Sequence, residues 1–227
     1  MHYLINHLPT AWALTVIHLR LSLVPVLAGV AIALPWGVLA WHTTALRRLT
    51  TVAASAVFTI PSLALFVVLP LLIPTRILDE ANVIVALTLY TTALLVREVF
   101  EALDAVPLQV RDAATAVGYR PIGRLLKVEL PLSIPVLVAG LRVVVVTNIS
   151  MVSVGAVIGI GGLGTWFTEG YQANKSDQIV AGIVAIFVLA VIIDAVLMFA
   201  GRIATPWVRV SRPSRRLPTA PLVGGSR

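Results

Sequence analysis

The sequence predicts an all-α, polytopic membrane protein with about five transmembrane helices. Composition is the first observation: 59% of the 227 residues are hydrophobic, only 12% are charged, and the mean hydropathy is +0.98. A soluble domain of this size needs a more polar surface, so the lipid bilayer is the expected solvent of the chain. The second observation is that the apolar residues form runs close to the length of about 20 residues that a helix needs to cross a bilayer.

Five such runs are the expected transmembrane helices. The first contains Pro25 and Pro35, which should kink it and require neighbouring groups to satisfy the carbonyls that they free. The third run, residues 81–96, is short, and a longer helix from this run would extend to Phe100. In chain order the runs cover residues 21–41, 51–73, 81–96, 136–158 and 179–200.

The two terminal segments differ from this transmembrane domain of residues 21–200. Residues 1–20 are mixed in polarity, and Tyr3 and Trp12 suit the headgroup region, so we expect an external, interfacial segment. No Lys, Arg or small-residue cleavage pattern occurs at the start, so no cleaved signal peptide is predicted. Residues 201–227 are basic and rich in Pro, Ser and Gly, which predicts a disordered tail.

The distribution of basic residues predicts the orientation of the chain. Most of the 17 Lys and Arg residues fall on one side of the five-span topology, in the segments that follow the first, third and fifth runs. Only Arg20, Arg76 and Lys175 fall on the other side. By the positive-inside rule, the C-terminus is expected in the cytoplasm and the N-terminus outside. The net charge of +7 is thereby explained without a nucleic-acid partner.

The longest polar segment inside the apolar chain predicts an elbow made of two short helices. Pro107 suits the first turn of a helix, and Gly118 suits a left-handed stop. Pro121 can begin a second helix, which we expect Pro131 to end. We therefore expect a helix–Gly–helix elbow lying along the membrane surface.

This elbow resembles the EAA loop in the permease subunits of binding-protein-dependent, type I ATP-binding-cassette (ABC) importers. The loop reads Glu-Ala-Ala, three residues, Gly, nine residues and Ile-x-Leu-Pro, and this chain keeps that spacing with Asp for Glu and Val for Ile. The resemblance implies that residues 101–131 are a cytoplasmic coupling loop that inserts into a separate ATPase subunit. We expect the small side of the first helix, with Ala113, Ala114 and Val117, to meet that ATPase. The matching positions are Asp112, Ala113, Ala114, Gly118, Leu130 and Pro131.

Other stretches resemble the glycine betaine, carnitine and choline osmoprotectant permeases within this class. They are IPSLAL at 60–65, KVELPLSIPVLVAGLR at 127–142 and GIGGLG at 159–164. The resemblance implies a permease that passes glycine betaine, choline, carnitine or proline betaine across the cell (inner) membrane. It also implies three partners: a cytoplasmic ABC ATPase, a second permease subunit (the same chain or a paralogue) and an external substrate-binding protein. A permease for methionine or another amino acid is the alternative within the class.

The sequence offers no catalytic or cofactor site of its own. It has no cysteine, its four histidines have no ligand spacing, and no Ser/His/Asp set converges. GIGGLG lacks the following Lys-Ser/Thr of a phosphate loop, so we interpret it as a flexible external turn or a re-entrant loop. We therefore predict no enzyme and no cofactor, with ATP used by the partner subunit.

Polar residues inside the expected spans are the remaining candidates. Arg142 and Asp194 fall at similar depth and should form an ion pair, with a proton or ion relay as the alternative. The polar residues Ser62, Asn148 and Ser153 either bond helix to helix or line a translocation path.

Two readings from other classes stay open at this point. An ion-coupled secondary transporter would usually show internal repeats and ionisable groups near the midplane. A non-transporting scaffold that docks a cytoplasmic partner would need the elbow but no path.

Overall fold

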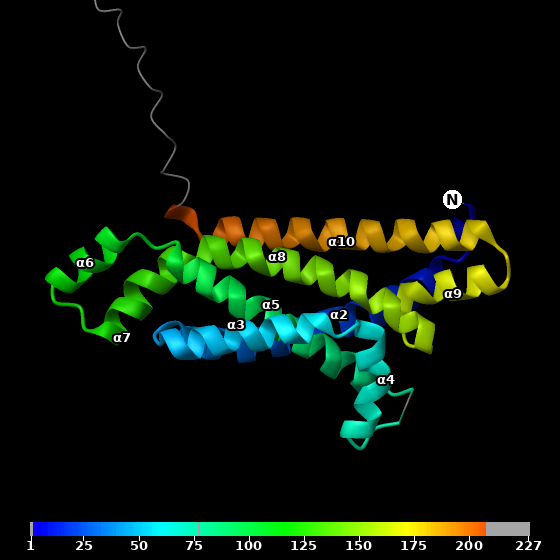
Figure 1. The fold of residues 1–227 in the computed structure, drawn as a ribbon. Helices are drawn as coiled ribbons and strands as arrows, with labels where there is room; N and C mark the ends of the chain where they lie inside the picture. The colour runs from blue at the N-terminus through cyan, green and yellow to red at the C-terminus, as the bar shows by residue number, and fades with distance from the viewer. Residues whose placement is uncertain (1, 77, 208–227) are drawn as a thin grey trace, which may run out of the picture.

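The computed structural model describes residues 2–76 and 78–207, and all regular structure in these residues is helical. The long helices lie side by side in an elongated bundle (Figure 1). The helices are α1 (His2–Asn6), α2 (Leu8–Trp41), α3 (Thr44–Thr59), α4 (Ser62–Leu72), α5 (Glu80–Asp104), α6 (Leu108–Ala116), α7 (Pro121–Arg124), the π-helical turn η1 (Leu125–Glu129), α8 (Leu130–Gly155), the 3-10 turns η2 (Ala156–Ile158) and η3 (Gly162–Gly164), α9 (Thr165–Gln172) and α10 (Ser176–Ala204).

The number of candidate membrane spans agrees with the sequence prediction. By length and composition, four continuous helical segments can cross a membrane: Leu8–Trp41, Glu80–Asp104, Pro121–Ile158 and Ser176–Ala204. Helices α3 and α4 together make a fifth span if the bent pair is counted as one.

Helix α2 is longer than the first apolar run. It begins at Leu8 rather than near Leu21, so residues 8–20 continue the helix instead of forming a separate segment, and both internal prolines stay within it. Its buried face carries small residues that allow close packing on α5. A Cβ on Gly37 would lie 2.8 Å from Val99, and one on Gly29 would overlap Thr91. Small residues at such crossings let two membrane helices approach closely.

The second expected span, residues 51–73, is not one continuous helix. Helices α3 and α4 meet at an angle of 102°, and α4 turns out of the bundle (Figure 1). The bend lies at Ile60, which is extended with ψ 126° because the ring of the following Pro61 disfavours helical geometry. The carbonyl of Ile60 accepts a hydrogen bond from the hydroxyl of Tyr90 on α5. This backbone carbonyl at the bend therefore has a hydrogen-bond partner within the chain.

Helix α5 is the central element and has the largest buried face in the bundle. It packs against α2, α3, α4 and α8. At one end its side chains Val83, Leu87 and Tyr90 join a core with α4 and α8. At the other end Leu95, Val96 and Phe100 join a core with α2 and α3.

The elbow keeps its glycine stop but not its expected end at Pro131. Gly118 has φ +98°, the left-handed conformation expected of it. The second elbow helix does not end at Pro131: it runs from Pro121 through η1 into α8 without a break. In η1 the N–H of Leu130 bonds to the carbonyl of Leu125, five residues earlier. This wider turn directly before Pro131 places the proline in the first turn of α8, where its missing N–H is tolerated.

The glycine-rich segment at 159–164 is a packed turn rather than a flexible one. Gly159 and Gly162 have φ of +82° and +46°, and Leu163 is fully buried. A Cβ on Gly162 would lie 2.8 Å from the backbone of His18 on α2. The glycines are thus explained by close approach of the turn to α2.

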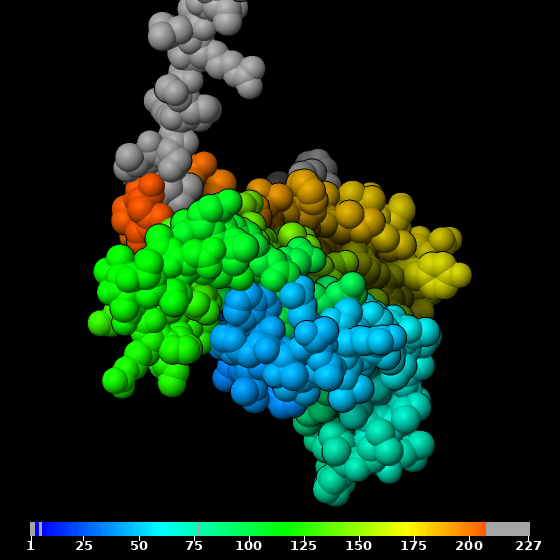
Figure 2. All heavy atoms as spheres, turned by 60° about the vertical axis from the view of Figure 1, so that its left-hand side comes forward, coloured from blue at the N-terminus to red at the C-terminus, as the bar shows by residue number. Residues whose placement is uncertain are grey.

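The two ends of the bundle carry different features. The elbow and the end of α10 lie at one end, and α1 and α9 lie at the other (Figure 1). Figure 2 shows the elbow (green) at the same end of the molecule as the start of α3 (blue). Helix α10 continues to Ala204 into the expected tail, and residues 208–227 of that tail lie outside the described residues.

Candidate functional site: the elbow and its attachments

Helix α6 presents only part of the EAA-like motif to its surroundings. Asp112 and Ala113 are exposed, and so is Val117. Ala114 is 8% exposed and faces its own chain. The helical period turns Ala114 inward, whereas Ala113 and Val117, four residues apart, share the outer face, so of these three residues Ala113 and Val117 are the exposed ones.

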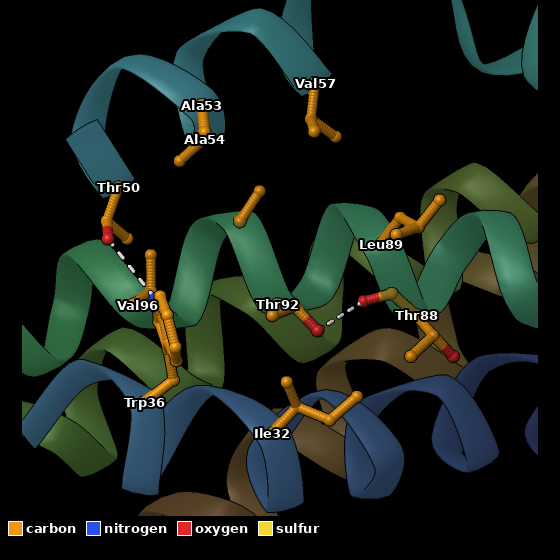
Figure 3. A pocket seen from close by; sticks show the side chains of 11 residues that line it. Ile32, Trp36, Thr50, Ala53, Ala54, Val57, Thr88, Leu89, Thr92 and Val96 are labelled. Carbon is orange, nitrogen blue, oxygen red and sulfur yellow. Dashed lines mark hydrogen bonds between the residues drawn. The ribbon is translucent and has the colours of Figure 1, made fainter. Parts of the chain in front are cut away.

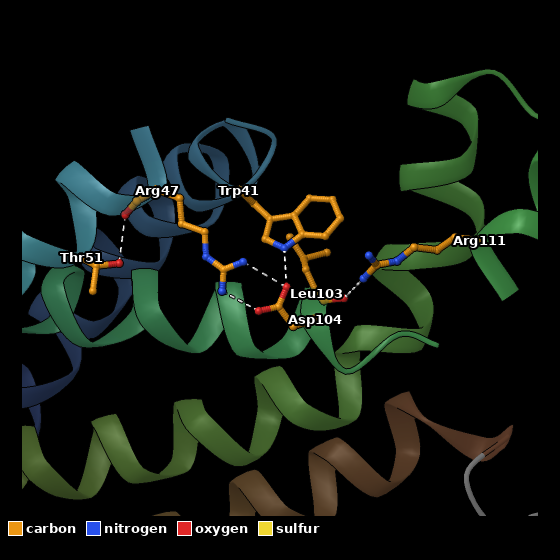
Figure 4. Close-up of polar contacts among 6 residues, drawn as sticks. All are labelled: Trp41, Arg47, Thr51, Leu103, Asp104 and Arg111. Carbon is orange, nitrogen blue, oxygen red and sulfur yellow. Dashed lines mark hydrogen bonds and ion pairs between the residues drawn. The ribbon is translucent and has the colours of Figure 1, made fainter. Parts of the chain in front are cut away.

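Arg111 attaches α6 to the transmembrane helices (Figure 4). Its guanidinium lies 4.7 Å from the ring centroid of Trp41 on α2, and its Nη2 donates to the carbonyl of Leu103 on α5. A guanidinium suits this place because it combines stacking on an aromatic face with hydrogen-bond donation.

Asp104 joins three helices beside this contact (Figure 4). Its Oδ1 accepts hydrogen bonds from Trp41 Nε1 at 2.8 Å and from Arg47 Nη1 at 3.2 Å, and its Oδ2 accepts from Arg47 Nη2 at 2.5 Å. The carboxylate therefore holds the end of α2 and the start of α3 to the last residue of α5. We call Trp41, Arg47, Asp104 and Arg111 the Asp104 node.

A second polar link connects the elbow to α8. Arg124 Nε donates to Glu129 Oε1 at 2.7 Å, and Arg124 Nη1 donates to the hydroxyl of Thr115 on α6 at 2.9 Å. Glu129 is fully buried. Its Oε2 has no hydrogen-bond partner among the described residues. Because a buried carboxylate is costly without partners, Arg124 is fixed in place and ties α6, α7 and η1 together.

Leu130 and Pro131 belong to this junction rather than to the exposed side of α6. They form the first turn of α8, and Leu130 lines an apolar hollow with Leu34, Leu103 and Leu125. The motif is thus divided in space: Asp112 and Ala113 face outward, Gly118 turns the chain, and Leu130 and Pro131 join the elbow to the bundle.

Arg142 and Asp194 are brought together by α8 and α10. Arg142 Nε donates to Asp194 Oδ1 at 2.8 Å, and Arg142 Nη2 donates to Oδ2 at 2.6 Å. This is a bidentate pair with both side chains about one-third exposed (32% and 34%). Fork-to-carboxylate geometry fixes the rotation of the two helices against each other.

The three polar residues considered for a path do not share a surface. Asn148 is 1% exposed. Its Nδ2 donates to Thr91 Oγ1 at 2.8 Å and to the carbonyl of Val144, so it bonds α8 to α5 inside the subunit. Ser153 lines a groove with Phe167 and Ile183 on the α9–α10 side. Ser62 begins α4 at the bend.

A mostly apolar groove between α2, α3 and α5 contains a few polar groups (Figure 3). Trp36 Nε1 donates to Thr50 Oγ1 at 3.2 Å across it, and Thr88 and Thr92 on α5 line it. On the neighbouring outer face of α3, the exposed Ser55 and Thr59 donate to carbonyls one turn earlier in the helix.

Sequence reasoning missed the Asp104 node and Glu129. One signal was available: an acidic residue at the last position of a helix opposes the helix dipole and calls for a cationic partner. No such local signal marks Glu129, whose burial depends on the uninterrupted passage from η1 into α8. Within residues 2–76 and 78–207 no group of three or more His, Asp or Glu side chains is placed to hold a metal ion.

Comparisons with known proteins bear on this arrangement. Residues 26–210 match the family model described as binding-protein-dependent transport system inner membrane component. The chain is 33% identical to the osmoprotectant import permease protein OsmW of Salmonella typhimurium (strain LT2), over 91% of this chain and 97% of the relative. It is 30% identical to the choline transport system permease protein OpuBB of Bacillus subtilis (strain 168), over 91% and 95%.

A solved structure shows the same fold. In the inward-facing MetNI methionine ABC transporter, a chain matches 90% of this chain and 99% of its own length, with a TM-score of 0.71 and 28% sequence identity. The overlap covers nearly all of both chains, so the bent pair α3–α4 and the elbow lie within a known permease architecture.

Proposed function

The chain belongs to the family of binding-protein-dependent transport system inner membrane components, and from this premise we propose that it passes a quaternary-amine osmoprotectant. It is a permease component of an ABC importer rather than an enzyme. The observation that carries the choice of solute is likeness over nearly the whole length to relatives named for osmoprotectant and choline transport. Glycine betaine, choline, carnitine and proline betaine share a quaternary ammonium group whose nitrogen carries methyl groups and no N–H.

Energy comes from a separate ABC ATPase that docks on the elbow. The outer face of α6, with Asp112, Ala113 and Val117, is exposed and includes small side chains, which permit close approach of a partner. Gly118 and the Arg124–Glu129 link hold this face in a fixed relation to α8. An external binding protein delivers the solute at the opposite end of the bundle.

The solute path runs beside α3 and α4, between this chain and a second permease subunit, either another copy or a paralogue. Interrupted backbone is tolerated at membrane depth only where it lies against protein or a water-filled cavity. The bend at Ile60 is such a place, and exposed Ser55, Thr59 and half-buried Ser62 lie around it. Large apolar residues are exposed on α10, such as Phe187, and also on α3 and α4, such as Val52 and Leu72, so the polar groups at the bend are what favour the α3–α4 side for the path. In this arrangement Asn148 is an internal brace and Ser62 lies at the path.

Uptake by membrane vesicles tests the proposal. The chain is produced with its ATPase and binding protein, and labelled choline, glycine betaine and methionine are compared with ATP and with a non-hydrolysable analogue. We expect uptake of a quaternary amine that requires ATP hydrolysis. Uptake driven by an ion gradient without ATP would identify a secondary transporter, and no uptake under any condition would favour a scaffold.

Methionine is the second candidate solute because of the likeness to the methionine transporter structure. ATP-dependent uptake of methionine alone, with none of choline or glycine betaine, would replace the osmoprotectant proposal while leaving the permease assignment intact.

A further inference from the structure

Resting on the proposed function, we propose that Asp104 is a positioning residue that passes the movement of the elbow to α2 and α3. Without it, the ATPase would still dock and hydrolyse ATP, but the helices beside the path would not follow. The proposal concerns the coupling between hydrolysis and transport rather than docking itself.

The geometry of the Asp104 node carries the proposal. Arg111 is the side chain of α6 that reaches the transmembrane helices, through the Trp41 ring and the Leu103 carbonyl (Figure 4). Trp41 in turn donates to Asp104, and Asp104 holds Arg47 by two hydrogen bonds. A continuous chain of contacts therefore runs from α6 through α2 and α5 to the first turn of α3.

Asp104 carries the one negative charge of the node, between two positively charged arginines. Arg47 and Arg111 are both cationic, and the charge of each acts on the Asp104 carboxylate. Arg47 also lies 5.2 Å from the ring centroid of Phe100, so it is fixed from two sides. Replacing the carboxylate by a neutral amide would leave two like charges facing a group that no longer attracts them.

The position of the node connects it to the path. Arg47 lies in the first turn of α3, and α3 leads directly to the bend at Ile60. Because a helix is rigid, a displacement of its first turn also moves its far end. If the first turn of α3 is no longer held to Asp104, movement of α5 and α6 does not reach α3. Losing the contact at Asp104 should therefore release the bend while leaving the outer face of α6 in place.

The chain offers a matched control at the other end of the bundle. Arg20 on α2 pairs with Glu80 on α5, again with both side chains partly exposed. Asp104→Asn and Glu80→Gln each remove one negative charge from α5, one near the elbow and one far from it. Only the first should affect coupling.

The experiment measures ATP hydrolysis stimulated by the binding protein and solute uptake in the same reconstituted complex. For Asp104→Asn we expect hydrolysis and ATPase co-purification close to those of the unmodified complex, and solute moved per ATP lower by about twofold to fivefold, the effect of losing a partly exposed ion pair. Asp104→Glu, which keeps the carboxylate, should restore most of the ratio. Glu80→Gln should leave it unchanged.

Two tryptophan variants separate the contacts within the node. Trp41→Phe keeps an aromatic ring beneath Arg111 and loses only the donor to Asp104. Trp41→Leu loses both. If the ring carries the movement of Arg111, the transport-to-hydrolysis ratio should fall further for Trp41→Leu than for Trp41→Phe.

A distance measurement tests the node without relying on transport. The chain has no native cysteine, so spin labels can be placed at Gln109→Cys on α6 and Val52→Cys on α3, both exposed positions. Labelled subunits are diluted with unlabelled ones. We expect a narrow distance distribution in the otherwise unmodified chain, a broad one with Asp104→Asn, and a narrow one with Glu80→Gln.

The outcomes are distinct. An unchanged ratio and an unchanged distance distribution in Asp104→Asn would overturn the proposal, as would a proportional fall of hydrolysis and uptake or an equal effect of Glu80→Gln. If the unmodified complex moves no solute with ATP, the proposed function fails, and the distance measurement alone then decides whether Asp104 ties α6 to α3.

Discussion

At the residue scale, the Arg142–Asp194 pair shows how a charged contact is kept between two apolar helices. The two hydrogen bonds of 2.8 and 2.6 Å satisfy both carboxylate oxygens of Asp194. We predict that Arg142→Leu or Asp194→Leu alone lowers the melting temperature of the purified protein more than the two changes combined, because each single change leaves a charge without its partner in a low-dielectric site. A double variant less stable than both single variants would contradict this.

Neighbouring residues of the elbow motif should respond differently to the same substitution. Ala113→Arg adds bulk and charge to the exposed face of α6, so we expect the chain to insert normally and to lose co-purification of the ATPase. Ala114→Arg adds the same group at a position only 8% exposed, so we expect the elbow itself to open, which limited proteolysis between residues 104 and 131 would detect. Normal ATPase binding by Ala113→Arg would show that docking uses another face.

The sequence predicted the role of a residue well where that role depends on local chemistry. It predicted poorly which side chains are buried or paired, because that depends on how the helices pack. Gly118 and the Arg142–Asp194 pair follow from backbone freedom and from the cost of charge in a membrane. The motif spacing does not predict that the chain itself covers Ala114, because that burial depends on packing. Asp104 was missed because its partners lie 57 and 63 residues away in the sequence.

At the element scale, Gly118 sets the direction of the second elbow helix. Its φ of +98° is strained for any residue with a side chain, although a Cβ there would meet nothing within 4 Å. We expect Gly118→Val to cost about 1–3 kcal/mol locally and to abolish uptake while the protein still inserts in the membrane. Gly123→Val is the matched control, because Gly123 is helical and its Cβ would meet only Tyr119 at 3.8 Å. Equal losses for both variants would show that bulk rather than backbone strain is responsible.

Helix direction was the part of the fold that hydropathy did not predict. Apolar length identified the four continuous segments that can cross a membrane and the region of the bent pair α3–α4, which makes a fifth span if it is counted as one, because burial in lipid depends on composition. The 102° bend depends on the extended backbone conformation of one residue, Ile60, which precedes a proline. The uninterrupted passage through Pro131 depends on a π-helical turn whose hydrogen bonds have no simple sequence signature.

At the scale of the whole molecule, the basic residues are distributed unevenly. The start of α3, the elbow and the end of α10 carry Arg47, Arg48, Arg111, Arg120, Arg124, Lys127 and Arg202, whereas Arg20, Arg76 and Lys175 lie in segments outside the elbow region. Basic residues are retained on the cytoplasmic side of a membrane. The elbow end is therefore expected to be cytoplasmic, which is also where an ATPase has access to ATP.

The orientation can be tested with single cysteines, since the chain has none of its own. Gln109→Cys places a thiol on α6, and Asn174→Cys places one in the turn between α9 and α10, at the other end and exposed. In intact cells with a permeable outer layer, we expect a membrane-impermeant maleimide to label Asn174→Cys at once and Gln109→Cys only after the membrane is opened, because the candidate span Pro121–Ile158 lies between these positions and puts them on opposite sides. Labelling of both from one side would mean that the segment Pro121–Ile158 does not cross the membrane. Labelling of Gln109→Cys alone from outside would reverse the orientation and separate the elbow from any cytoplasmic ATPase.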